Sequence, residues 1–155
     1  MHHLAIMNPK LKLLPKILSG EKTIESRWYK SRIAPWNRIN KNDLIYFKNA
    51  SQPVTLKAQV LKVLQFEQYT QPKLAQIITE YGGNPGICFV DQKKTLITKL
   101  REKNYCILIF LKHPQPVIPF YINKTGFGNA CAWITLKDIN QIRIQNKVRI
   151  LNKKQ

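Results

Sequence analysis

The stretch Gly20-Glu21-Lys22-Thr23-Ile24-Glu25-Ser26-Arg27 joins a segment of helical periodicity to a segment of β character. Its first residue is a glycine, which is typical of the position just past a helix end. In a strand over 22–27 alternate side chains share a face, so Glu25 and Arg27 are neighbours that can pair. Lys22 is the first residue of this segment, where the turn after Gly20 can bring its ammonium over the face that Glu25 and Arg27 share. We expect a cleft at this face. Two cations around one carboxylate favour a bound anion nearby, although an ion pair that only fixes the turn remains the alternative.

Aromatic and cationic residues are interleaved in the segment that follows, which contains Trp28, Tyr29, Lys30, Arg32, Trp36 and Arg38. Bases stack on aromatic rings while cations hold phosphates, so this composition is typical of a surface for single-stranded nucleic acid. Trp36 follows a proline and is expected to anchor the loop in the core. Trp28 or Tyr29 is expected to be the exposed stacking platform. We therefore predict nucleic-acid contacts at Arg27, Trp28, Tyr29, Lys30 and Arg32.

Hydrophobic periodicity along the rest of the chain predicts an α+β fold. Apolar residues alternate most clearly over 54–66, which predicts a long strand with a bend or bulge near 61–63. The segment His113-Pro114-Gln115-Pro116 is interpreted as a proline-rich turn. About six or seven strands with two or three flanking helices are typical of a small barrel. The other predicted β segments are 2–6, 22–27, 43–48, 105–111, 117–122, 132–136 and 139–144, and the predicted helices are 11–19, 71–81 and 92–101.

The length of 155 residues is that of one ordinary domain. No repeat, low-complexity block or long linker divides the sequence, so we predict a single domain over 1–151 and a frayed polar end at 152–155. No apolar run approaches the ~18 residues of a membrane span, and the first residues lack the basic and apolar regions of a signal peptide. A cytoplasmic protein without membrane contacts is expected.

The composition is unusual in its large excess of basic over acidic residues. Lys and Arg number 26 against 8 Asp and Glu, which gives a formal net charge of +18 spread along the whole chain. A basic surface of this kind attracts polyanions, and nucleic acid is the expected partner. A merely solvated basic face is the alternative.

Cysteine and histidine usage indicates neither a metal site nor a cofactor. Cys88, Cys106 and Cys131 have no CxxC spacing and apolar neighbours, so buried reduced thiols are expected. The pair His2 and His3 is interpreted as incidental. The sequence has no P-loop, no dinucleotide-binding glycine motif and no Ser-His-Asp arrangement.

The motif at 20–27 resembles the G-x-K-x-x-E-x-R signature of the ASCH family. The segments Asn42 to Phe47, Asn123 to Gly128 and Ala132 to Ile134 are also similar to segments of that family, so the resemblance covers most of 2–145. It implies a PUA-like β-barrel with a cleft beside the signature and an RNA-related role. It also implies that hydrolysis of RNA or of acylated nucleosides is possible, since some members of the family have that activity.

Three functions remain open on these grounds. The first is an RNA-binding domain with a polar cleft for a nucleotide or RNA segment. Tyr46 is expected near this cleft, and Lys124 at the rim of the cleft. The second is an RNA-directed hydrolase, a ribonuclease or modified-nucleoside amidohydrolase, with Lys22 and Glu25 as catalytic residues. The amidohydrolase members resemble the chain less well, because they have Thr where Glu25 stands. A carboxylate cannot replace a hydroxyl nucleophile without a change of mechanism. The third is a protein-binding adaptor that uses the stripe Leu74, Ile77, Ile78 and Tyr81.

Overall fold

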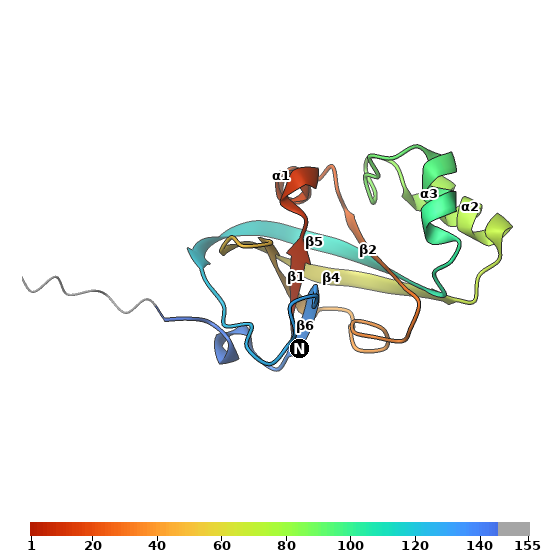
Figure 1. Cartoon of the computed structure of the whole chain (residues 1–155). Coiled ribbons are helices and arrows are strands. Elements are labelled where there is room, and N and C mark those ends of the chain that lie inside the picture. The colour runs from red at the N-terminus through yellow and green to blue at the C-terminus, as the bar shows by residue number, and fades with distance from the viewer. Residues whose placement is uncertain (146–155) are drawn as a thin grey trace, which may run out of the picture.

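Six strands form one curled sheet, a half-barrel, with three α-helices packed on it (Figure 1). The computed structural model describes residues 1–145. The strand order is β2-β5-β4-β3-β1-β6, and every neighbouring pair is antiparallel except β1 with β3. The predicted α+β class is therefore confirmed. The strands are β1 (His2–Met7), β2 (Ile24–Tyr29), β3 (Leu44–Asn49), β4 (Val54–Glu67), β5 (Tyr105–Phe120) and β6 (Trp133–Leu136), and the α-helices are α1 (Leu13–Ser19), α2 (Gln71–Tyr81) and α3 (Lys93–Leu100).

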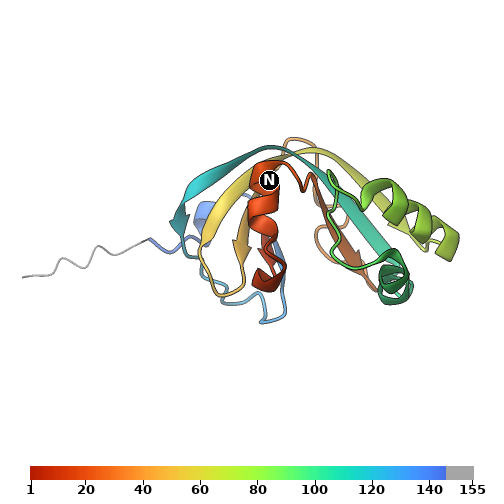
Figure 2. The ribbon, with the colours of Figure 1, turned by 90° about the horizontal axis from the view of Figure 1, so that it is seen from above.

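The curl comes from the two long central strands, which arch over the molecule in the view of Figure 2. Their register shifts at three places along β4, and another shift separates Phe47 from Lys48 in β3. Such bulges increase the local twist and bend a strand. The expected long strand over 54–66 is confirmed as β4, with one of its irregularities between Val60 and Lys62.

β5 is one continuous strand, so the predicted break into 105–111 and 117–122 with a proline-rich turn between them is wrong. The chain only kinks there, with His113 in the left-handed region at φ 52°. β2 pairs with β5 from Tyr105 to Phe110, and beyond that point β5 has β4 as its single neighbour. Proline is tolerated on such an edge because a missing N–H interrupts no ladder there. Pro114, Pro116 and Pro119 therefore indicated an edge strand rather than a turn.

The helices begin and end at recognisable caps. α2 has the bounds predicted for it, with the Thr70 hydroxyl accepting from the Lys73 N–H and Pro72 in the first turn. α1 is shorter than the predicted helix over 11–19, because Lys12 is left-handed at φ 51° and separates α1 from the 3-10 turn η1 (Pro9–Leu11). Gly20 ends α1 at φ 84°, a conformation that favours glycine. None of the helices within residues 1–145 has the length and apolar character needed to cross a membrane.

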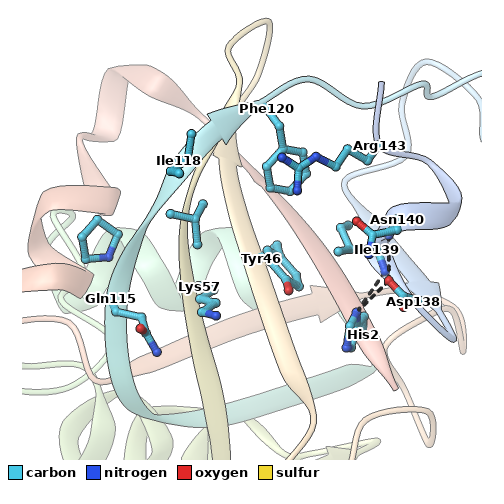
Figure 3. A pocket seen from close by; sticks show the side chains of 12 residues that line it. His2, Tyr46, Lys57, Gln115, Ile118, Phe120, Asp138, Ile139, Asn140 and Arg143 are labelled. Atoms are coloured by element: carbon cyan, nitrogen blue, oxygen red, sulfur yellow. Dashed lines mark hydrogen bonds and ion pairs between the residues drawn. The ribbon is translucent and has the colours of Figure 1, made fainter. Parts of the chain in front are cut away.

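The segment 139–144 is not the predicted strand. It contains the 3-10 turn η2 (Ile139–Gln141), held by a capping box between Asp138 and Gln141, and one isolated bridge from Arg143 to Ile122. The η2 turn also docks on β1, since the Ile139 N–H donates to His2 Nδ1 at 2.9 Å (Figure 3). The apolar residues Ile139 and Ile142 are buried, which explains why this stretch had the hydrophobic content of a strand.

Apolar clusters pack on both sides of the sheet. The interior of the curl holds Phe47, Ile107, Ile109 and Trp133 against α1. On the other side of β2 and β5, the helices α2 and α3 pack against residues such as Leu108. Three members of the stripe proposed as an adaptor surface are buried in these clusters and are not available for docking, namely Leu74, Ile77 and Ile78.

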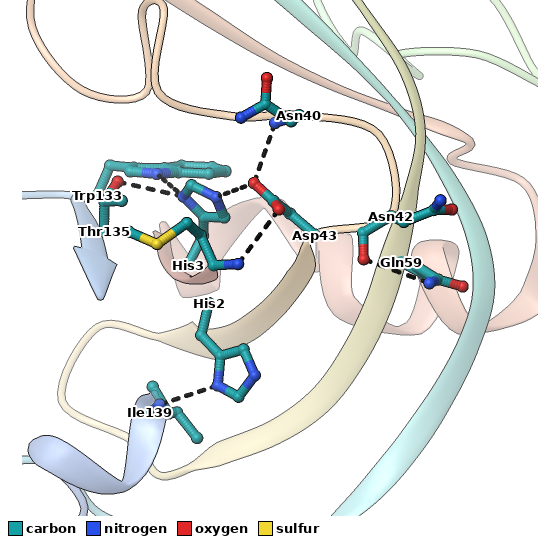
Figure 4. Close-up of polar contacts among 10 residues, drawn as sticks. His2, His3, Asn40, Asn42, Asp43, Gln59, Trp133, Thr135 and Ile139 are labelled. Atoms are coloured by element: carbon teal, nitrogen blue, oxygen red, sulfur yellow. Dashed lines mark hydrogen bonds and ion pairs between the residues drawn. The ribbon is translucent and has the colours of Figure 1, made fainter. Parts of the chain in front are cut away.

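A buried histidine in β1 ties this strand to β6 and to the turn before β3 (Figure 4). His3 has no exposed surface; its Nδ1 accepts from Trp133 Nε1 at 3.2 Å, and its Nε2 lies 2.9 Å from Asp43 Oδ2. Because Nδ1 accepts, the proton must be on Nε2, which donates to the carboxylate. Burial lowers the pKa of His3 from its ordinary value of 6.5, although the Asp43 hydrogen bond opposes this shift. His3 is therefore a structural residue of the core.

This network predicts an acid-sensitive stability. The free energy of unfolding should fall as the pH drops below about 6.5, because His3 binds a proton in the unfolded chain at a higher pH than in the folded one. The decline should level off once the pH is below the lowered pKa of the folded state. His3→Gln should flatten the curve below about pH 6.5, measured by urea denaturation. The control is His113→Asn, at an exposed left-handed position that Asn tolerates, and an unchanged slope in His3→Gln would contradict the assignment.

Candidate functional site

Lys22 lies almost out of contact with solvent, with 3% of its surface exposed. It precedes β2 and forms an isolated bridge with Gly86. Its Nζ donates to the carbonyl oxygen of Ile24 at 2.8 Å and to that of Ile87 at 2.9 Å. A third contact, of 3.4 Å, joins Nζ to Glu25 Oε2. The ammonium therefore ties the segment around Ile87 to the start of β2.

Glu25 and Arg27 share a face of β2 and pair, as the strand alternation predicted. Arg27 Nε donates to Glu25 Oε1 at 3.1 Å. The same guanidinium donates from Nη1 to the Ala132 carbonyl at 3.3 Å, and its centre lies 5.1 Å from the centre of the Trp133 ring. Arg27 thus links the edge strand β2 to the chain entering the opposite edge strand, β6.

The carboxylate of Glu25 is enclosed, with 4% of the residue exposed. Its Oε2 lies within ion-pair distance of Lys22 but makes no hydrogen bond, so the contact is electrostatic and poorly aligned. Its two oxygens face Lys22 and Arg27 and are closed off from solvent, so the carboxylate is not free to reach a substrate. This geometry favours a structural role for Glu25 over that of a catalytic base.

A hollow with a volume of about 640 Å³ runs beside this ion cluster. Its walls come from the end of β1 with η1, from the start of α1, from β2, from the segment around Ile87 to Asp91 and from α3 with the turn after it. Lys22 and Glu25 lie in its wall, so the ion cluster is next to an opening although its charged atoms are nearly sealed. The cations Lys99 and Lys103 are more accessible, and Lys99 pairs with Asp91 at 2.8 Å.

The two aromatic residues expected to form a platform also line this hollow. Trp28 is half-buried: its Nε1 donates to the Ser26 hydroxyl at 3.0 Å and its ring meets Tyr69 edge-on at 5.9 Å. Tyr29 is half-buried as well, and burial raises the pKa of its phenol. Neither ring is the fully exposed platform that the sequence predicted. Trp36 packs against the core and meets Tyr105 edge-on at 5.0 Å, as expected of an anchor.

Four other predicted residues lie away from the hollow. Lys30 is exposed, and Arg32 is held by Glu67 at 2.8 Å on the surface. Lys124 Nζ donates to the Asn129 carbonyl at 3.0 Å. Tyr46 lines a different hollow, so the expectation that it lies near Lys22 is wrong. Adjacent residues of a strand face opposite sides, and Phe47 takes the interior position.

Comparison with known proteins identifies a shared architecture. Crystal structures of the ASCH protein of Zymomonas mobilis superimpose on this chain with a TM-score of 0.61 and 17% identity, covering 90% of this chain and 91% of that one. A Tyr-to-Phe variant of that protein gives 0.61 and 15%, with 90% and 93% coverage, and a Ser-to-Ala variant gives 0.63 and 15%, with 90% and 91%. This chain has the ASCH fold. No protein-family model and no curated protein matches the sequence.

On this ASCH fold, the hollow also contains residues that the sequence analysis did not assign to it, among them those of the segment around Ile87, of α3 and of the turn after α3. Lys99, Lys103 and Asp91 carry no motif, and α3 is about 70 positions from β2 in the chain. No local periodicity indicates a contact over that separation. Only the docking of α3 beside the edge of β2 brings these residues to the hollow.

The three cysteines of this chain are free thiols. Cys88 and Cys106 are buried as predicted, whereas Cys131 is half-buried. Burial raises the pKa of the Cys106 thiol, which keeps it protonated. Within residues 1–145 no group of three or more His, Cys, Asp or Glu side chains could hold a metal ion.

The closed ion cluster predicts the effect of Lys22→Ala. Removal of the ammonium leaves a buried carboxylate with one partner fewer and two carbonyls without a donor, so the free energy of unfolding should fall by about 3–5 kcal/mol. Urea denaturation measures it. The matched control is Lys30→Ala, at an exposed position where a change within about 0.5 kcal/mol is expected. If the two variants are equally stable, the cluster is not a folding element.

Proposed function

We propose that this chain is a member of the ASCH family that binds RNA, single-stranded or structured, along the hollow beside β2. The observation that supports this most is the hollow itself, since it combines lysines, a half-buried tryptophan and a rigid ionic wall in about 640 Å³. That volume is in the range of small-ligand sites and accommodates one nucleotide of a longer chain. The net charge of +18 supplies the long-range attraction that brings a polyanion to the surface.

The accessible cations are assigned to the phosphates. Lys103 has no ion-pair partner within residues 1–145, and the exposed pair of Lys99 with Asp91 is of a kind that contributes little to stability. A phosphate that approaches Lys99 can therefore replace or join Asp91 at small cost. Trp28 offers a ring beside these lysines for contact with a base.

The ion cluster is assigned to positioning rather than chemistry. Arg27 directs its donors to Glu25, Ala132 and Met7, and Lys22 directs two of its donors to carbonyls. Such groups have little capacity left to stabilise a developing charge on a substrate. This favours RNA binding over the RNA-directed hydrolase that uses Lys22 and Glu25.

A charge-reversal pair tests the proposal. Lys99→Glu with Lys103→Glu should weaken binding of a short single-stranded RNA by about tenfold or more and lower the slope of log affinity against log salt by about 2. Fluorescence anisotropy over a salt series measures both quantities. The matched control is Lys93→Glu with Lys94→Glu, which changes the net charge equally at two residues of α3 outside the hollow.

Two results would contradict the proposal. Equal losses of RNA affinity in the two double variants would mean that RNA binding depends only on the overall charge and not on this hollow. Absence of binding at low salt to any RNA, single-stranded or structured, would remove the function altogether. A double-stranded DNA of equal length, run in parallel, tests whether RNA is preferred.

A further inference from the structure

A second hollow, of about 420 Å³, lies on the outer face of the sheet (Figure 3). Strand alternation separates it from the interior, because Tyr46 faces outward where its neighbour Phe47 faces inward. Its floor comes from β3, β4 and β5, and η2 with the residues after it forms one wall. It shares no lining residue with the hollow beside β2.

Two cations in this hollow have no anionic partner within residues 1–145, where neither Lys57 nor Arg143 forms a side-chain hydrogen bond or an ion pair. Lys57 pairs in register with Tyr46 on one side and with Gln115 on the other, which places it in the floor. Arg143 lies over the Phe120 ring with its guanidinium carbon 4.5 Å from the ring centre. That stacking orders the guanidinium while its N–H groups stay available to an anion.

Two ring side chains of the hollow, those of His2 and Tyr46, can also donate a hydrogen bond. His2 Nδ1 accepts from the Ile139 N–H, so the proton of the neutral ring must be on Nε2, which has no partner among the described residues. An Nδ1 that accepts cannot also pair as a cation with Asp138, 3.8 Å away. Burial raises the pKa of Tyr46, which keeps its hydroxyl protonated and able to donate. The ring of Tyr46 meets those of His2 and Phe120 at tilted angles of 54° and 71°, so neither neighbour is stacked face to face on it.

We propose that this outer hollow binds a nucleotide, with its phosphate between Lys57 and Arg143 and its base against Tyr46. Two cations without partners, neutral donors and an aromatic ring within one concave site are the chemistry that a phosphate joined to a planar base requires. The ligand is either a free mononucleotide or one nucleotide of an RNA chain. Asp138 is the one carboxylate in the lining, and its side chain is 54% exposed at the rim. This site does not depend on RNA binding at the hollow beside β2.

Titration of uridine 5′-monophosphate, inorganic phosphate and a short oligouridylate, followed by calorimetry and by amide chemical shifts, tests the site. Lys57→Gln should weaken nucleotide binding about tenfold or more, since it removes a charged donor. Asp138→Asn should tighten it about two- to fivefold, because it removes a repelling charge while an Asn side chain can still cap η2. These opposite signs are expected of an anion site and would be reversed at a site for cations.

The matched control is Lys62→Gln, which makes the same charge change on the same strand but outside this hollow. Binding of uridine 5′-monophosphate with the expected signs assigns a free nucleotide, and the same signs with the oligouridylate alone assign an RNA chain. Both effects should persist when Lys99 and Lys103 are replaced by Glu, which separates this site from the first hollow. Equal losses in Lys57→Gln and Lys62→Gln, or binding of inorganic phosphate as tight as that of the nucleotide, would overturn the proposal. So would the absence of binding by any probe.

Discussion

The contact of Arg27 with the chain entering β6 is the interaction on which the arrangement of the molecule depends. The sheet ends at β2 on one side and at β6 on the other, and no ladder joins these edges within residues 1–145. Arg27 spans the gap, with one donor on the Ala132 carbonyl and its guanidinium beside the Trp133 ring. Glu25 holds the guanidinium in place and Lys22 holds Glu25. A buried ionic cluster adds little stability by itself, but a missing member is costly, so it specifies one geometry of the curl.

The basic character of the surface follows from where the few acids lie. Glu25, Asp43, Glu67 and Asp91 all lie within 4 Å of a cationic group. Half of the eight acidic residues are therefore occupied in local pairs, and many lysines face solvent without a counter-charge. Both hollows open on this field, one beside β2 and one on the outer face of the sheet. The field attracts polyanions without selecting among them, whereas each hollow adds shape and aromatic contact.

An element was predicted well where the residues that determine it, such as a cap or an alternating run, lie within or next to the element itself. The cap at Thr70 and the proline after it determine the start of α2, and alternation determines β4. The prolines of β5 led to the wrong prediction of a turn, because a proline is compatible with a turn or with an edge strand. Which of the two forms depends on whether β2 extends alongside this part of β5. The segment 139–144 was predicted wrongly because Ile139 and Ile142 are buried in and directly after a 3-10 turn, which has no periodicity that distinguishes it from a short strand. The predicted frayed end at 152–155 lies outside the described residues.

The sequence by itself determined the net charge, the end of α1 at Gly20 and the shared face of Glu25 and Arg27, because each depends on composition or on neighbours along the chain. Tertiary structure alone decided that Lys22 is enclosed, that α3 brings Lys99 to the edge of β2, and that Tyr46 belongs to another hollow. Strand alternation says which residues share a face, but not which element covers that face. That is set by register shifts and by the curl of the sheet, which arise from contacts between distant parts of the chain.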